Sequence, residues 1–181
     1  MTIGGVNAKM WWGATALLAV LILALASTNT KAEEINVVAF NVESGPDTDP
    51  VKVAADISKV PGVDIWGLSE VGGESAMATF RQHLGPQYKM VAGTTGGDDR
   101  LVVFYDHEHL EAFEHWELRA GGKRDPLVVR FRSRDSGKKF LFVLNHFDWK
   151  DASVRQAQAG FVRDWAARRR GAVIIAGDFN F

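Results

Sequence analysis

The sequence predicts an α/β fold in which helices cover both faces of the sheets. Short apolar runs typical of buried strands alternate with segments whose apolar residues recur every three to four positions, as in amphipathic helices. A hairpin is expected around residues 135–138, so at least part of the sheet structure is antiparallel. With 181 residues and no internal repeat or linker, the chain is long enough for one domain with its own core.

The first half is predicted to alternate strand and helix twice. Residues 35–40 form an apolar strand, and Asp49 followed by Pro50 marks the start of a helix, because aspartate caps a helix and proline suits its first position. Residues 63–68 form the next strand. A second helix follows the Gly72-Gly73 break, and its predicted inward face consists of Ala76, Met77, Phe80 and Leu84.

The second half is predicted to contain mostly strands, with one long helix. Residues 88–92 and 101–105 are expected to be strands, whereas residues 106–119 show no clear pattern. Residues 127–134 alternate arginines with apolar residues and return through residues 140–144, which predicts the hairpin. A helix starting at Asp151 or Ser153 and a last strand over 172–176 follow. The predicted inward stripe of that helix is Val154, Ala157, Phe161, Val162 and Trp165.

Composition excludes several kinds of chemistry. The chain has no cysteine, which excludes disulfides, thiolate metal sites and cysteine nucleophiles. Its formal net charge of −1 predicts no overall attraction to nucleic acid or to anionic membranes. Eight basic residues nevertheless lie between Arg119 and Lys139, against two acidic ones, so any contact with a polyanion would begin there; the alternative for the three arginines at 130, 132 and 134 is a solvated surface.

The N-terminal segment is predicted to direct the chain to or across a membrane. Lys9 precedes an apolar run over residues 10–26, and Ala24-Leu25-Ala26 offers small residues at cleavage spacing. We therefore expect residues 1–26 to be a signal peptide, the protein to be secreted or periplasmic, and residues 33–181 to form the folded domain. Seventeen apolar residues are also close to the length that spans a bilayer, so a membrane anchor is the alternative.

Polar residues follow four of the predicted strands. Asn41 and Glu70 follow the first two, the pair Asn145-His146 follows the hairpin, and Asp178 with Asn180 follows the last strand. Sites in α/β sheets collect beyond the carboxyl ends of strands, so these side chains are expected to converge. In an extended chain Asp178 and Asn180 would share one side and Phe179 the other. The chemistry suits a magnesium-type hydrolase of phosphoesters, because hard cations prefer oxygen ligands and an imidazolium can hydrogen-bond a phosphate.

These residues resemble the endonuclease/exonuclease/phosphatase superfamily, which includes pancreatic deoxyribonuclease, bacterial sphingomyelinases and inositol phosphate phosphatases. The resemblance covers residues 35–181 and also includes Arg155-Gln156; Gly-Asp-Phe-Asn at 177–180 is its most specific block. It implies a four-layer α/β sandwich with two mixed β-sheets between helices. The family pattern continues to a Ser-Asp-His block that this sequence does not contain, so we expect the last strands to be missing and the domain to be incomplete at the C-terminus.

The resemblance also implies roles for individual residues. Asn41 and Glu70 would hold a divalent metal, Mg2+ or another hard cation such as Mn2+ or Ca2+. His146 would contact the scissile phosphate, while Asp178 and Asn180 would orient the attacking water and the phosphate. Asn145 and Arg100 are the expected substrate-binding residues, although Arg100 suits a structural role at a strand edge equally well.

The predicted function is that of an exported, metal-dependent phosphoester hydrolase, and a nuclease-like phosphodiesterase is favoured. Within the same chemistry, a sphingomyelinase-like phospholipase and an inositol phosphate phosphatase are alternatives. The alternative of another class is a catalytically incomplete module that binds a metal or a polyanion without turnover. The expected partner is the phosphoester substrate, including nucleic acid; no stable protein partner is evident and a monomer is expected.

Overall fold

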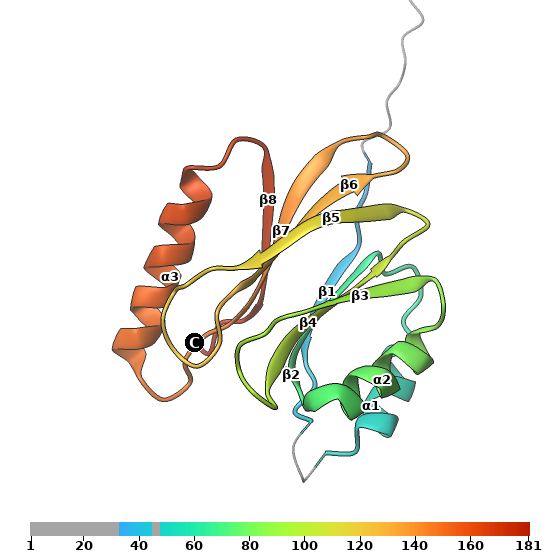
Figure 1. Ribbon diagram of the computed structural model, residues 1–181, viewed down its shortest axis with the longest axis horizontal. Helices are drawn as coiled ribbons and strands as arrows, with labels where there is room; N and C mark the ends of the chain where they lie inside the picture. The colour runs from blue at the N-terminus through green and yellow to red at the C-terminus, as the bar shows by residue number, and fades with distance from the viewer. Residues whose placement is uncertain (1–32, 45–47) are drawn as a thin grey trace, which may run out of the picture. The chain divides into compact units, whose positions relative to one another are not determined.

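The computed structural model describes residues 33–44 and 48–181 of the chain (Figure 1). The predicted signal peptide or anchor over residues 1–26 lies outside the described residues. Within the described part, every helix is too short or too polar to cross a membrane.

Over residues 33–44 and 48–181, eight strands form two mixed sheets of four strands each. The first sheet has the order β1-β2-β4-β3, in which β1 and β2 are parallel and the other neighbours antiparallel. The second sheet has the order β5-β6-β7-β8, in which only β7 and β8 are parallel. The strands of the first sheet are β1 (Val37–Asn41), β2 (Ile65–Val71), β3 (Tyr88–Ala92) and β4 (Arg100–Asp106). Those of the second are β5 (Leu110–Glu117), β6 (Leu127–Ser133), β7 (Lys139–His146) and β8 (Ala172–Asp178).

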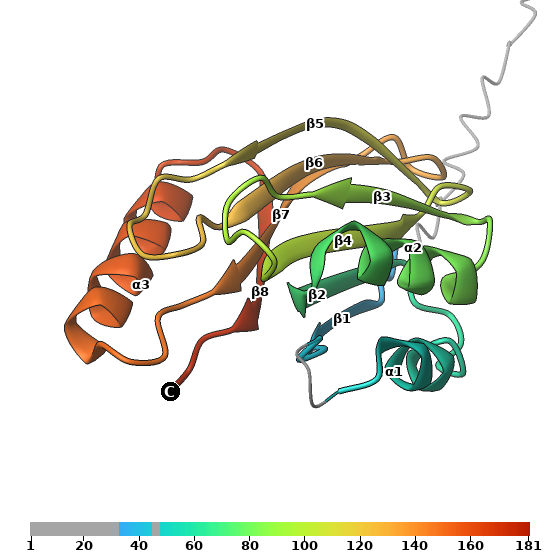
Figure 2. The ribbon, with the colours of Figure 1, turned by 60° about the horizontal axis from the view of Figure 1, so that its bottom comes forward.

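The three helices in the described part of the chain cover the outer faces of the two sheets (Figure 2). Helices α1 (Pro50–Ile57) and α2 (Gly73–Leu84) pack on the first sheet, where Ala54 and Phe80 meet Trp66 in one apolar cluster. Helix α3 (Ala152–Ala167) packs on the second sheet through Trp165. The order of layers is therefore helix, sheet, sheet, helix, as the resemblance implied.

The inner faces of the two sheets form a shared core. Val103 of β4 and Ile65 of β2 pack there with Phe131 and Phe142 of the second sheet. The two sheets are in close contact at Gly67 of β2, where an added Cβ would lie 2.7 Å from a methyl carbon of Leu144. Close packing of this kind fixes how the ends of the strands in one sheet meet those in the other.

Most elements agree with the sequence prediction, and the apolar face of one helix does not. The cap at Asp49 is confirmed, since its carboxylate accepts a hydrogen bond from the Val51 amide at 2.9 Å, and the inward face of α2 is the predicted one. Strand β5 lies in the stretch for which no element was predicted. In α3, by contrast, Gln158 is buried whereas Phe161 is 39% exposed, so the predicted apolar stripe of that helix is partly wrong. Gln158 is buried because its amide is hydrogen-bonded to two neighbouring loops, as described below.

Candidate active site

The carboxyl ends of four strands meet at one place in the molecule. In each sheet the two strands that supply site residues are the parallel pair, β1 with β2 and β7 with β8, so each pair ends at a common edge. Strand β8 of the second sheet lies against β1 and β2 of the first. The predicted convergence of Asn41, Glu70, His146 and Asp178 follows directly from this arrangement.

Asn41 lies between two carboxylates. Its Nδ2 donates to Glu70 Oε1 at 2.9 Å and to Asp178 Oδ2 at 3.0 Å. Because both oxygens bond the same nitrogen, they are no more than about 6 Å apart. The Oδ1 of Asn41 accepts from the Glu43 amide at 3.0 Å, so the side chain is held at both ends. Glu70 and Asp178, which are 108 positions apart in the chain, thus meet in one cluster, as the sequence predicted.

The backbone of strand β2 is irregular at Glu70. Its φ is +59°, and the pairing of β2 with β4 shifts register between Leu68 and Val71. A non-glycine residue in the left-handed region costs on the order of 1 kcal/mol and persists only where its surroundings enforce it. The bulge interrupts the alternation of β2 and presents Glu70 at the cluster, a common use of bulges beside functional sites.

His146 is almost fully buried beside both carboxylates. Its Nε2 lies 3.5 Å from Glu70 Oε1, 3.7 Å from Asp178 Oδ2 and 3.4 Å from Arg124 Nη2. Burial lowers the pKa of His146, the Arg124 guanidinium lowers it further, and the two carboxylates only partly oppose these effects. The imidazole is therefore neutral near pH 7 in the structure described here, in contrast to the imidazolium that the sequence prediction used.

Arg124 and Asp99 also belong to the cluster, although sequence reasoning did not select them. The buried Arg124 guanidinium pairs with Asp99 Oδ2, and Lys123 Nζ lies 3.0 Å from the same oxygen. Glu70, Asp99 and His146 each offer a ligand atom, and these atoms all lie within 4.8 Å of one another. Both missed residues lie on connections between strands, where no spacing rule applies. The only sequence feature that could have pointed to them is that each is a charged residue in a glycine-rich loop.

Two side chains, one partly buried and one fully buried, hold the loops that carry these residues. Glu117 of β5 accepts hydrogen bonds from the amides of Thr94 and Thr95, each at 3.0 Å, and from both hydroxyls. Burial would raise the pKa of Glu117, but these hydrogen bonds outweigh it and the pKa is lowered. Gln158 of α3 accepts from the Asp148 amide at 2.8 Å and donates to the Gly121 carbonyl. Each tether positions a loop rather than touching the cluster.

The donor set at the cluster fits a hard divalent cation. Three carboxylates, those of Glu70, Asp99 and Asp178, meet there, and oxygen is the ligand that Mg2+, Mn2+ and Ca2+ prefer. Asp99 Oδ1 is buried without a hydrogen-bond partner in the described structure, as expected of an acceptor that a cation would satisfy. Asn41 presents its amide nitrogen to the carboxylates, so a ligand role for its oxygen would require the amide to turn over.

The other predicted site residues lie at the margin of the cluster. Asn145 is fully buried and donates to the Ala176 carbonyl at 3.2 Å, which joins β7 to β8. Asn180 donates to the Phe147 carbonyl at 2.9 Å. Arg100 Nε donates to the Gly97 carbonyl at 2.9 Å, and its Nη1 lies 3.4 Å from a Glu74 carboxylate oxygen, as in a structural pair.

The predicted side-by-side orientation of Asp178 and Asn180 is not what the structure shows. Strand β8 ends at Asp178, and Asn180 has a φ of +54°, so the alternation of an extended chain stops between them. Instead, the Asn180 backbone amide donates to Asp178 Oδ1 at 3.0 Å. The contact holds the carboxylate in place while its other oxygen bonds Asn41.

Solved structures with this fold were found, although no family model and no curated protein sequence matches the chain. A mannosyl-6-phosphatase of Bacteroides thetaiotaomicron is 20% identical with a TM-score of 0.69, and the match covers 81% of this chain and 66% of that one. TDP2 of D. rerio, solved in complex with a single-strand DNA product, is 18% identical with a TM-score of 0.70, covering 81% and 61%. The human Nocturnin catalytic domain with bound sulfate is 17% identical with a TM-score of 0.66, covering 81% and 65%.

These similarities confirm the fold that the sequence resemblance implied. Similar structures also include one described as an endonuclease/exonuclease/phosphatase family protein, from Bacteroides thetaiotaomicron. At identities of 20% or less, the similarity concerns the arrangement of sheets and helices. This chain spans slightly less than two thirds of the length of those structures.

Proposed function

We propose that this chain, which has the fold of the endonuclease/exonuclease/phosphatase proteins, is a metal-dependent hydrolase of phosphoester bonds. The observation that carries the proposal is the meeting of Asn41, Glu70, His146 and Asp178 from four strands and both sheets. If these polar residues only capped helices or stabilised loops, they would not need to meet at one place. Strand ends and loops that together bring carboxylates, an imidazole and a buried guanidinium within a few ångströms have the parts that phosphoryl hydrolysis requires.

The carboxylates of Glu70, Asp99 and Asp178 would hold the divalent cation. When bound, such an ion supplies charge neutralisation at the oxygens of a phosphate. Asn41 keeps Glu70 and Asp178 at a fixed separation through its two hydrogen bonds. Asp178, oriented in addition by the Asn180 amide, is placed to accept a hydrogen bond from an attacking water.

Arg124 and His146 would receive the phosphate itself. The guanidinium is buried and permanently charged, so it offers fixed donors to phosphate oxygens without reorganisation. His146 is neutral beside it, and an arriving phosphate adds negative charge near Nε2, which favours protonation of the ring. The imidazolium predicted from the sequence would thus form on substrate binding.

We favour a phosphodiester substrate, as in a nuclease-like phosphodiesterase. The support is the Asn145-His146 strand ending, which resembles exported nucleases, and the fold shared with a TDP2 structure that contains a single-strand DNA product. A phosphomonoester is the alternative, since a mannosyl-6-phosphatase has the same fold. Export to the periplasm or medium is part of the proposal and rests on the apolar run over residues 10–26 alone.

The test is hydrolysis of bis(p-nitrophenyl) phosphate, with p-nitrophenyl phosphate as the monoester comparison. We expect turnover that requires Mg2+ or Mn2+ and that falls at least about a hundredfold in Glu70→Gln and in Asp178→Asn. Glu111→Gln is the control, because Glu111 lies at the surface on β5, where its carboxylate pairs with Arg132 of β6. Turnover without metal, or full activity in Glu70→Gln, would refute the proposed site. Metal binding by calorimetry with no turnover of either ester would favour the non-catalytic module instead.

A further inference from the structure

A basic groove lies at the other end of the second sheet from the candidate active site. It is a hollow of about 320 Å3, bounded on one side by the residues that follow α3 and on the other by strands β5, β6 and β7. Lys139 begins β7 and His146 ends it, seven residues later. At about 3.3 Å per residue the groove lies about 23 Å from the cluster, so the two are separate.

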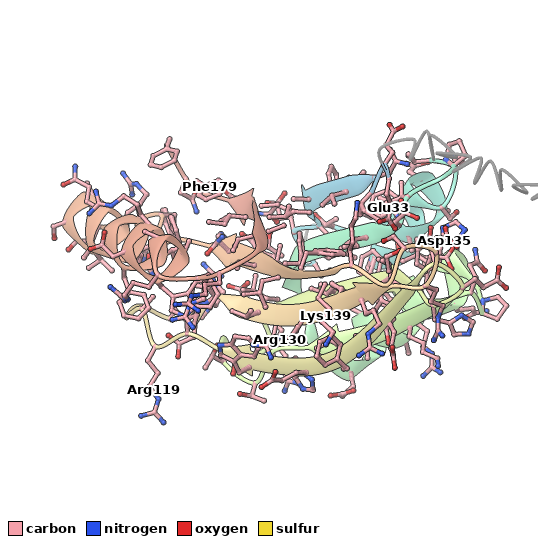
Figure 3. The ribbon with its side chains drawn as sticks, turned by 90° about the horizontal axis from the view of Figure 1, so that it is seen from above. Glu33, Arg119, Arg130, Asp135, Lys139 and Phe179 are labelled. Atoms are coloured by element: carbon pink, nitrogen blue, oxygen red, sulfur yellow. The ribbon has the colours of Figure 1, made fainter. Side chains whose placement is uncertain are left out.

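Among the residues that the structure describes, five basic ones and no acidic one line the groove. These residues are Arg130, Lys139, Arg168, Arg169 and Arg170. Figure 3 shows Arg130 and Lys139 on the same side of the molecule, with Arg119 projecting from that side nearer the end at which Phe179 lies.

Most of this positive charge is not neutralised by the protein. Arg130 pairs with Glu114 at 2.6 Å on the surface. Among the described residues, Lys139, Arg168 and Arg170 have no carboxylate within 4.0 Å. Arginines that follow a helix do favour its negative end, and Arg169 Nε donates to the Trp165 carbonyl at 3.2 Å. That explanation accounts for Arg169 but not for Lys139, which comes from a strand.

An aromatic ring lies among these cations. Phe113 is 41% exposed at the bulge of edge strand β5. The charged groups of Arg130, Arg132 and Lys139 lie 5.9, 5.5 and 5.5 Å from the centre of its ring. An exposed phenylalanine on a free sheet edge is otherwise unfavourable, whereas cations beside an accessible ring suit a ligand that carries both phosphates and aromatic bases.

We infer that this groove binds a segment of single-stranded nucleic acid, with phosphates along the basic residues and a base against Phe113. The lining residues lie on or beside the four adjacent strands of the second sheet. At the usual spacing between strands, the width of these four strands is about 14 Å, which accommodates a short run of nucleotides. A hollow with cations on its walls does not suit a flat anionic membrane. Binding in the groove is independent of the hydrolase chemistry, but its use as a guide for substrate rests on the proposed function.

The experiment measures fluorescence anisotropy of a labelled oligothymidylate of twelve nucleotides with the full chain in EDTA, which excludes turnover. We expect the double variant K139E/R170E to weaken binding at least tenfold and to flatten its dependence on salt concentration. Phe113→Ala should weaken binding severalfold with the salt dependence unchanged, because stacking is not ionic. K139Q/R170Q should fall between K139E/R170E and the wild type, and circular dichroism checks that each variant is folded.

The matched control is K52E/K89E, which changes the net charge equally. Both lysines are exposed and lie on the first sheet and its helix α1, away from the groove. We expect less than a twofold effect of K52E/K89E. Equal losses in the two double variants would overturn the proposal, because they would show only a general effect of charge. Loss of binding to phosphatidylserine vesicles, with oligothymidylate binding unchanged, would overturn it in favour of a lipid surface. Failure of the hydrolase proposal is seen separately, as absent turnover of bis(p-nitrophenyl) phosphate by the wild type.

Discussion

Replacing Glu117 by glutamine should loosen the loop that carries Asp99 without altering the cluster itself. Glu117 lies at the end of β5 in the second sheet, whereas Thr94 and Thr95 lie on the connection between β3 and β4 of the first. Four hydrogen bonds from these two threonines end on its carboxylate. The side chain therefore joins the two sheets beside the candidate site, and glutamine keeps its shape while removing its charge.

The magnitude follows from the number and kind of these bonds. A hydrogen bond to a charged group contributes about 1.5–3 kcal/mol and a neutral one about 0.5–1.5, so each bond loses about 1 kcal/mol. Three of the four end on one oxygen, Oε1, and the side chain is only partly buried, so we take about half of the sum. Glu117→Gln should then lower the free energy of unfolding by about 2 kcal/mol and Tm by about 4–8 °C.

The pH dependence gives this prediction a specific sign. The pKa of Glu117 is lowered in the folded protein from an ordinary value of 4.5, so the carboxylate's contribution is complete above that value. It is lost as the pH falls through the folded pKa. The difference in Tm between the wild type and Glu117→Gln should thus be constant from pH 5.5 to 8 and should shrink below about pH 4.5.

Thermal unfolding followed by circular dichroism is the assay, and Glu114→Gln is the matched control. Glu114 lies on the same strand and pairs with Arg130, but both side chains are well exposed, and such pairs contribute about 0–1 kcal/mol. The reasoning is refuted if Glu117→Gln costs no more than Glu114→Gln, or if its effect on Tm does not change between pH 7 and pH 4.

Three further outcomes are expected. Gly177→Ala should lower the free energy of unfolding by more than about 3 kcal/mol in urea titrations, because the φ of Gly177 is +132° and the new Cβ would lie 2.0 Å from a carbonyl oxygen of β7. Gly171→Ala is the control: Gly171 has a φ of +104° but no described atom within 4 Å of the added Cβ, so the change should cost about 1 kcal/mol. Equal costs for the two variants would contradict the steric argument. A hydrogen bond to Asp64 raises the pKa of His109, so the stabilisation is complete below about pH 6.5 and is lost as the pH rises through the folded pKa. The wild-type Tm should fall slightly between pH 6 and 8, and His109→Gln should abolish that slope; a slope that persists in the variant would show that another group causes it. Arg124→Lys keeps the positive charge but loses the bidentate hydrogen-bonding geometry of the guanidinium, so turnover of bis(p-nitrophenyl) phosphate should fall about 10- to 100-fold. An unchanged rate would show that a positive charge alone is enough at this position.

The sequence by itself determined the elements whose signals are local. Caps such as Asp49, the apolar face of α2 and the hairpin between β6 and β7 depend on residues a few positions apart, and the structure has each of them. The sequence also predicted that the polar residues after four strands would meet, because parallel strands end at a common edge. The structure confirms this for Asn41, Glu70, His146 and Asp178.

Only the tertiary structure decided which residues from the connecting loops enter the cluster. Arg124 and Asp99 are there because Glu117 holds the loop between β3 and β4 while Gln158 holds the loop between β5 and β6, and no local pattern encodes such contacts. The burial of Gln158 in α3 has the same cause, since its amide pairs with loop backbone, which the helical period does not reveal. Periodicity in a sequence reports which side of an element faces the core, whereas the composition of a cleft depends on contacts between residues far apart in the chain.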